Sequence, residues 1–197
     1  MRGKRLCATL LVSVYFTVGK CMRIPDVFGA RKFSMSKFLS TRIPIWTFYT
    51  TFGGNAECEV ELVRGINATS VALTRYFYEG QRKISSTLLG KLDPRHKDHL
   101  IIQTAGGYLF DQMIVYADKL YSCAVIKVTM RVCAHAATYD LLVWNSSITT
   151  GPNLRCIKEY AKREPRGRMI YRPQCQNILK IHGEFQQPSI RAVQCPR

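Results

Sequence analysis

The chain has 197 residues, of which 47% are hydrophobic and 21% are charged, and its formal net charge is +16. This composition is that of a globular protein with a sizeable core, and it excludes a disordered or fibrous chain. The positive charge predicts a surface that attracts anions such as sulfated glycans, acidic proteins or cell surfaces. We expect no nucleic acid partner, because the sequence has no recognisable nucleic-acid-binding motif.

The chain begins with the basic stretch MRGKRL, which is followed by the apolar run CATLLVSVYFTVG. A basic start ahead of a short apolar run is typical of a signal peptide, and the run is too short for a membrane span. We therefore predict a signal peptide over 1–21 and a secreted, extracellular protein with no membrane span. Removal of its four cations leaves a net charge of about +12.

Export changes the meaning of the eight cysteines. Two of them leave with the signal peptide, and an even number in an oxidising compartment indicates disulfides. Spacing alone does not choose among the pairings, and the absence of a C-x-x-C pair disfavours a zinc or redox site. The sequons at Asn67 and Asn145 predict surface glycans. The six remaining cysteines are Cys58, Cys123, Cys133, Cys156, Cys175 and Cys195.

Hydrophobic spacing predicts a short helix near residues 33–39, with Phe33, Met35, Phe38 and Leu39 forming a buried stripe. A series of short alternating segments follows, and their regular spacing predicts an antiparallel sandwich or barrel. These predicted strands are 45–52, 57–63, 69–80, 83–93, 99–105, 108–117, 121–130 and 138–144.

The pattern changes after Gly151. Residues 152–164 place Leu154, Ile157 and Ala161 at helical spacing, with Asn153 as a cap. An extended strap is predicted over 168–175, and 183–197 are predicted to form a C-terminal tail. No internal repeat or second-domain boundary is visible, so one domain is expected.

Five stretches together resemble the salivary lipocalins of hard ticks, a family that includes the histamine-binding proteins. The resemblance implies a mainly β fold: an eight-stranded up-and-down antiparallel lipocalin barrel over 22–182, with a short N-terminal helix and a C-terminal helix. The stretches are FLSTRIPIWTFYTTFGGNAEC (38–58), YFYEGQRK (76–83), YSCAVIKV (121–128), YDLLVWNSSITTGPNLRC (139–156) and IYRPQC (170–175).

The same resemblance implies two disulfides. Cys58 on the second strand would join Cys175 in the strap, and Cys123 would join Cys156 on the helix. Cys133 and Cys195 lie outside this pattern, and whether they form a third bridge stays open.

Amine-binding members of this family cage the cation of the ligand with inward carboxylates and aromatic rings, which suits an ammonium group in a partly dry cavity. Their pattern has an Asp directly after the cysteine of the seventh strand, where this chain has Ala124. It continues with Glu-Leu-aromatic on the eighth strand, where this chain has Asp140-Leu141-Leu142. Ile43 replaces another Asp of those relatives, and Trp46 matches a pocket tryptophan.

A strand over 138–144 places Asp140, Leu142 and Trp144 on one face, which we expect to point into the barrel. Asp140 would be the surviving acid of the cage, or alternatively a buried carboxylate with a purely structural role. Tyr76 and Phe110 lie on strands whose alternate residues must also face inward. The candidate ligand-binding residues are Trp46, Glu59, Tyr76, Phe110, Asp140, Leu142 and Trp144.

The four histidines are scattered along the chain, and His96 and His99 lie in a charged loop that is typical of solvated surface. The sequence contains no phosphate-binding loop, nucleophile elbow or metal-binding helix motif. We therefore expect a binding protein with no catalytic residues, no cofactor and no metal.

The resemblance implies a salivary protein that sequesters a small host inflammatory mediator, in the manner of proteins that evade host defence, and we expect a monomer. Histamine or serotonin is the ligand class that the resemblance implies. The loss of acids should weaken amine binding and makes the pocket more apolar, so the alternative is a lipid such as a leukotriene, thromboxane or fatty acid. Its anionic group would need a cation such as Arg75 or Arg82, and we expect Arg75 at the surface.

A third hypothesis makes the barrel a scaffold and the basic exterior a binding surface for a host protein or sulfated glycan. The cations near the predicted C-terminal helix and strap are Lys158, Lys162, Arg163, Arg166, Arg168 and Arg172.

Overall fold

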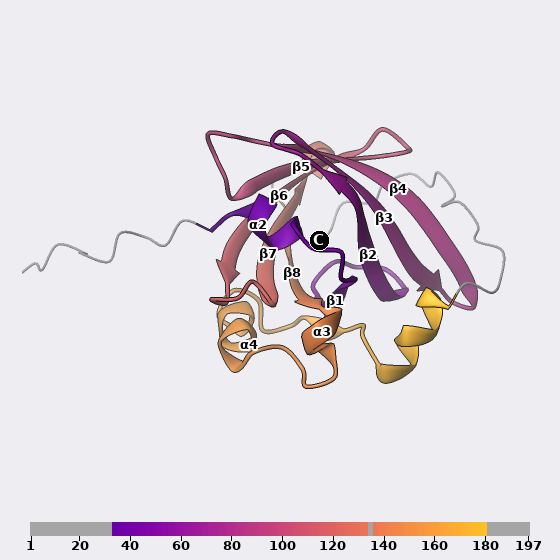
Figure 1. Cartoon of the computed structure of the whole chain (residues 1–197). Coiled ribbons are helices and arrows are strands. Elements are labelled where there is room, and N and C mark those ends of the chain that lie inside the picture. Colours follow the sequence, from indigo (N-terminus) through magenta and orange to yellow (C-terminus); the bar gives the residue numbers. More distant parts are fainter. Residues whose placement is uncertain (1–32, 134–135, 181–197) are drawn as a thin grey trace, which may run out of the picture. The chain divides into compact units, whose positions relative to one another are not determined.

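The computed structural model describes residues 33–133 and 136–180 (Figure 1). All eight predicted strands are present, and three short helical segments that the sequence did not indicate (η1, α3 and η2) join them. In chain order the elements are α2 (Met35–Leu39), β1 (Ile45–Thr50), β2 (Ala56–Ile66), β3 (Ser70–Glu79), β4 (Arg82–Leu92), β5 (His99–Thr104), β6 (Leu109–Ala117), β7 (Cys123–Met130), η1 (Arg131–Cys133), β8 (Ala137–Trp144), α3 (Asn145–Ile148), α4 (Leu154–Ala161), β9 (Arg168–Met169) and η2 (Pro173–Leu179).

The strands form one closed barrel. Consecutive strands from β2 through β8 pair antiparallel with one another, and β1 pairs with both β8 and β2 (Figure 1). This confirms the predicted eight-stranded up-and-down barrel and excludes the open sandwich. Because side chains alternate along each strand, every second residue faces the interior.

One hydrophobic cluster fills the interior at the end that helix α2 closes. Met35, Phe38 and Leu39 of α2 are fully buried there, as the predicted stripe requires. Trp144 at the end of β8 stacks on Phe38, with ring centroids 6.3 Å apart, and its Nε1 donates a hydrogen bond to the carbonyl oxygen of Phe38 at 3.2 Å. Buried side chains therefore close the barrel at the α2 end.

A second cluster lies outside the barrel wall, between the sheet and α4. It joins Trp46, Leu141 and Val143 of the wall to Cys156 and Tyr160 of the helix. The cap of α4 is confirmed, since Asn153 Oδ1 accepts a hydrogen bond from the backbone N–H of Arg155.

The buried side of α4 differs from the expected stripe. Cys156 and Tyr160 turn inward, whereas Leu154 is 73% exposed. The disulfide from Cys156 to Cys123 on β7 decides which face of α4 meets the barrel. This bridge is one of the two that the family resemblance implied.

The C-terminal strap completes the barrel wall. β1 and β2 pair only at Ile45 and Trp46, and the strap fills the gap beyond that point. The backbone N–H of Ile170 donates to the carbonyl oxygen of Phe48 on β1 at 3.0 Å, and the N–H of Cys58 on β2 donates to the carbonyl oxygen of Ile170 at 2.9 Å. The strap is thus hydrogen-bonded to both strands.

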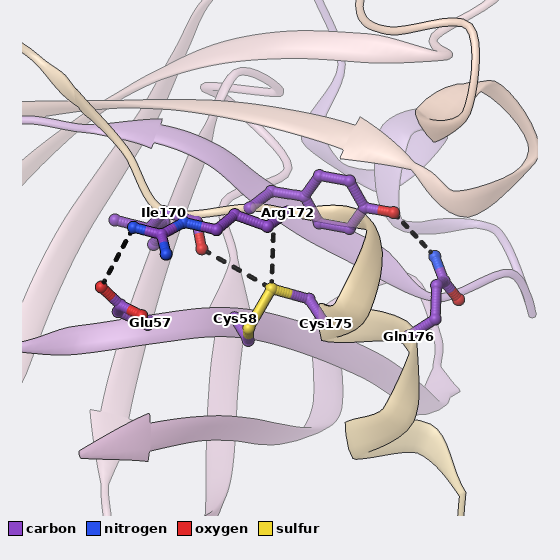
Figure 2. Close-up of a disulfide and its surroundings, with 7 residues drawn as sticks. Glu57, Cys58, Ile170, Arg172, Cys175 and Gln176 are labelled. Carbon is purple, nitrogen blue, oxygen red and sulfur yellow. Dashed lines mark hydrogen bonds and ion pairs between the residues drawn. A yellow bond between two sulfur atoms is a disulfide. The ribbon is translucent and has the colours of Figure 1, made fainter. Parts of the chain in front are cut away.

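The second implied disulfide, Cys58–Cys175, fastens the strap at this gap. Figure 2 shows the bridge with Ile170 and Arg172 of the strap beside it and Glu57 of β2 facing Arg172. The strap is extended only as far as Arg172, because η2 begins at Pro173. The prediction of an extended segment to residue 175 is corrected in that respect.

Candidate functional site

A cavity of about 300 Å³ lies inside the barrel at the end away from α2. This volume is at the lower end of the range of small-molecule sites, roughly 300–1,000 Å³. Residues 52–55 of the connection between β1 and β2, Ala56 at the start of β2 and two residues of the strap also contribute to its walls. The apolar lining includes Phe77, Leu88, Ile102, Phe110, Val128 and Ile170.

Strand β1 presents two threonines to this interior. The pairing of β1 with β8 shifts register between Thr47 and Tyr49, so that Phe48 and Tyr49 both pack in the outer cluster. A bulge of this kind changes which face the following residues occupy. It turns Thr50 inward as well as Thr47, although three positions separate them.

Each threonine binds a carboxylate from the neighbouring strand. Thr47 Oγ1 donates to Glu59 Oε1 of β2 at 2.9 Å, and Thr50 Oγ1 donates to Asp140 Oδ1 of β8 at 2.6 Å. Because β1 lies between β2 and β8, the two acids approach the cavity from either side of the same strand. Both carboxylates line the cavity.

Arg75 of β3 is the cation nearest these acids. It faces inward between Leu73 and Phe77, and its Nε lies 3.0 Å from Glu61 Oε1 and 3.7 Å from Glu59 Oε1. The expectation that Arg75 lies at the surface is wrong. Burial alone would lower the pKa of Arg75, but the two glutamates outweigh it and raise that pKa.

The surroundings of Asp140 disfavour its ionised form. Burial, followed by the negative charge of Glu59, raises the pKa of Asp140 to about 7. The hydrogen bond from Thr50 and the positive charge of Arg75 act in the opposite direction and only partly compensate. A cation placed beside Asp140 would favour its ionised form, because the hydrogen-bond donor to this carboxylate is the uncharged hydroxyl of Thr50.

Of the seven candidate residues, Glu59, Phe110 and Asp140 line the cavity. Leu142 and Trp144 share the inward face of β8 with Asp140, as predicted. They belong to the packed cluster at the α2 end, however, and do not line the cavity. Only part of the inward face of β8 is thus in reach of a ligand.

Trp46 and Tyr76 lie on the outer side of the wall, which corrects their predicted place in the cavity. Trp46 is 0% exposed and packs edge-on against Tyr171, and its Nε1 donates to Asn145 Oδ1 at 2.7 Å. Tyr76 lies between two inward residues of β3, Arg75 and Phe77, so alternation turns it outward. Its hydroxyl accepts a hydrogen bond from Arg64 Nη2.

Sequence reasoning missed Glu61, Thr50 and the strap as parts of the site. Glu61 shares its face of β2 with Glu59, so the alternation already pointed to it. Thr50 depends on the bulge in β1, and Ile170 and Arg168 depend on a contact between distant segments, neither of which the local pattern reveals.

Several predictions concern the exterior. Asn67 is exposed in the turn between β2 and β3, whereas Asn145 Oδ1 accepts hydrogen bonds from Trp46 and Gln176. Glycosylation at either site stays a prediction. Three predictions lie outside the described residues: the signal peptide over 1–21, the tail over 183–197 and the third bridge, which would join Cys133 to Cys195.

Most of the cations proposed as a basic patch have partners nearby. Lys162 and Arg163 contact Glu159, Arg166 contacts Glu164, and Arg172 contacts Glu57. Arg168 Nη2 donates to the carbonyl oxygens of Gly54 and Ala56 at 2.7 and 2.9 Å. The carboxylates of Glu57, Glu159 and Glu164 therefore offset part of the positive charge at the C-terminal helix and strap.

Within the described part of the chain, no helix has the length and apolar character needed to span a bilayer. The same residues contain no group of three or more His, Cys, Asp or Glu side chains arranged to hold a metal ion.

No protein-family model and no curated protein matches the sequence. Solved structures match its fold at low identity. The serotonin complex of AM182 has a TM-score of 0.58 at 18% identity and covers 73% of this chain and 93% of its own. Japanin from Rhipicephalus appendiculatus bound to cholesterol has a TM-score of 0.53 at 11% identity, covering 68% and 96%.

Lobster apocrustacyanin A1 has a TM-score of 0.52 at 12% identity and covers 70% of this chain and 79% of its own. At such identities the similarity concerns the fold, and it agrees with the closed barrel described above. The resemblance to tick salivary lipocalins is supported as far as this fold, and the chain has the lipocalin fold.

Proposed function

We propose that this protein is a secreted lipocalin that binds a small host mediator in its barrel and removes it by stoichiometric capture. The ligand class that we favour is a biogenic amine such as histamine or serotonin, and the protein acts without catalysis. The structural neighbour AM182 forms a complex with serotonin, which supports a small-molecule role for a barrel of this shape.

One observation carries the proposal. Three carboxylates, those of Glu59, Glu61 and Asp140, surround a single guanidinium at the inner part of the cavity. Glu61 already holds Arg75, so Glu59 and Asp140 are in excess. An ammonium group bound between them would offset part of this excess negative charge, and the low local dielectric would strengthen the interaction. The aromatic rings of Phe77 and Phe110 would add apolar contact.

A lipid mediator is the second candidate, because the rest of the lining is aliphatic and aromatic. The neighbour Japanin, which is bound to cholesterol, is in keeping with an apolar guest in this fold. An anionic lipid such as a fatty acid fits less well, since Arg75 is already bonded to Glu61 and the Glu59 carboxylate lies 3.7 Å from its Nε. A basic exterior that binds a host protein or sulfated glycan has less support, because nearby carboxylates offset part of the charge of its cations.

The test is calorimetric titration of the mature, oxidised protein with histamine, serotonin, a leukotriene and arachidonate. We expect heat with an amine, and a loss of about 10- to 100-fold in affinity for Asp140→Asn and Glu59→Gln, the range of one charge-assisted hydrogen bond. Glu57→Gln is the matched control, because Glu57 lies on β2 but is exposed outside the barrel. If a lipid binds and its affinity is unchanged by Asp140→Asn, the lipid mediator is favoured.

A further inference from the structure

The register of β2 and β3 places Glu61 directly opposite Arg75. Both Nε and Nη2 of the guanidinium are bonded to the same oxygen, Glu61 Oε1. The Glu61 side chain is only 7% exposed and does not line the cavity, whereas Arg75 does. Glu61 thus holds the guanidinium from the barrel wall, and the cavity side of Arg75 faces Glu59.

The distance to Glu59 is longer. Arg75 Nε lies 3.7 Å from Glu59 Oε1, beyond hydrogen-bonding distance, and the same oxygen accepts a hydrogen bond from Thr47. A guanidinium released by Glu61 has a second carboxylate within a small movement. Bidentate pairing of an arginine with a carboxylate is strong, so Arg75 would then occupy the acid that a cationic ligand needs.

We propose that Glu61 is the residue that determines which ligand charge the cavity accepts. By holding Arg75 against the wall, Glu61 keeps the Glu59 carboxylate open to a cationic ligand and keeps the guanidinium away from an anionic one. This inference rests on the proposed function for its cationic half only. Among the described residues, the other cation that lines the cavity is Arg168, whose guanidinium is bonded to backbone carbonyls of the β1–β2 connection.

Three variants test the two halves of the proposal. Glu61→Gln releases Arg75 to Glu59, and we expect affinity for serotonin to fall about tenfold. Adding Arg75→Met to it removes the competing guanidinium, and we expect the double variant to regain the affinity of the parent. Glu59→Gln combined with Glu61→Gln leaves Arg75 without either glutamate, and we expect this variant to bind anilinonaphthalene sulfonate and arachidonate at least tenfold more tightly than the parent.

The controls use the same strand. Glu57→Gln removes one negative charge from the exterior of β2 and should change neither the serotonin nor the anion affinity. Near-ultraviolet circular dichroism establishes that each variant is folded. If Glu61→Gln alone does not fold, the uncharged pair of Glu61→Gln with Arg75→Met replaces it, and we expect that variant to bind serotonin as the parent does and to gain no anion affinity.

The outcomes distinguish this inference from the proposed function. A parent protein that binds no amine overturns the proposed function, while the anion gain of the Glu59 and Glu61 double variant still decides the present proposal. The present proposal alone is overturned by a different set of results. The parent binds serotonin, Glu61→Gln keeps the serotonin affinity of the parent, and the Glu59 and Glu61 double variant gains no affinity for anions. A serotonin loss in Glu61→Gln that Arg75→Met does not reverse assigns Glu61 a purely structural role.

Discussion

Thr50 and Asp140 face each other across β1 and β8, and the hydroxyl of Thr50 donates a hydrogen bond of 2.6 Å to the carboxylate. This contact favours the ionised form of Asp140, against burial and the charge of Glu59, which together raise the pKa to about 7. The ionisation of Asp140 is therefore balanced near neutral pH, and the hydroxyl of Thr50 is one of the groups that set that balance.

The affinity for an amine should accordingly depend on pH. Ionised Asp140 is the form that pairs with an ammonium group, so affinity for serotonin should rise between about pH 6 and pH 8. Thr50→Val should shift this rise to higher pH, because the variant loses a donor to the carboxylate. Titrations across this pH range measure the shift, with Thr74→Val on the exterior as the control. A flat profile in the parent would contradict the role of Asp140.

Asp140→Asn should stabilise the ligand-free protein at alkaline pH. The folded state raises the pKa of this acid above its ordinary value of 3.8, so the folded protein binds the proton more tightly than the unfolded chain. The stability contributed by Asp140 is therefore lost as pH rises from about 4 to about 7. At pH 8 we expect the free energy of unfolding of the variant to exceed that of the parent by roughly 1–3 kcal/mol. The difference should vanish near pH 4, as urea denaturation at both values would measure.

This result bears on the alternative that Asp140 has only a structural role. A carboxylate retained for stability would give a variant that is less stable at pH 8. Lower amine affinity combined with higher stability would instead indicate that Asp140 serves binding at a cost to the free protein.

Trp46→Phe should weaken the fold and spare the ligand site. Trp46 is fully buried outside the barrel and donates a hydrogen bond to Asn145, so we expect a loss of about 1–3 kcal/mol in unfolding free energy. Phe110→Ala gives the contrast, because Phe110 lines the cavity and its loss should lower affinity. Calorimetric titration and thermal unfolding of both variants separate the two effects. A large loss of ligand affinity in Trp46→Phe would indicate that Trp46 contributes to ligand binding.

Tyr160→Phe should raise stability slightly. The Tyr160 hydroxyl is buried and has no hydrogen-bond partner among the described residues, and burial also raises the pKa of this group. Removing an unsatisfied buried hydroxyl should gain about 1 kcal/mol or cost nothing. Chemical denaturation measures the change, and a loss of more than about 1 kcal/mol would indicate that the hydroxyl is satisfied by bound water.

Cutting the strap disulfide should affect both stability and binding. Cys58→Ala combined with Cys175→Ala removes a bridge between residues 117 apart in the sequence, and we expect a cost of about 2–5 kcal/mol. Ligand affinity should fall as well, because Ile170 and Arg168 of the strap form part of the cavity wall. Removal of the Cys123–Cys156 bridge is the matched comparison, since that bridge joins α4 to β7 away from the cavity. Equal affinity losses in both variants would argue against a specific role of the strap.

The regular strands could be predicted in detail from the sequence. On β3 and β8 the alternation of side chains correctly put Arg75 beside Leu73 and Phe77, and Asp140 beside Leu142. A single strand does not reveal its neighbour, however. The partner of Arg75 depends on the register that sets Glu61 opposite it, and this register includes shifts on both sides of the paired residues.

Irregular backbone explains the remaining errors. The shift between Thr47 and Tyr49 breaks the alternation that would have put Trp46 and Thr50 on one face of β1. In β2, Cys58 adopts a φ of 57°, which a non-glycine residue rarely does, next to another register shift. Such bulges depend on how the barrel closes and on the disulfide at Cys58, and neither can be inferred from the spacing of apolar residues.

The position of the strap between β1 and β2 has a consequence for solubility. Where those strands diverge, each would otherwise present unpaired backbone groups, the kind of edge through which sheets of separate molecules join. Ile170 occupies hydrogen-bonding positions on both sides of that opening. The strap thus shields the barrel from edge-to-edge self-association, and the protein with Cys58 and Cys175 still reduced would be the form most prone to aggregate.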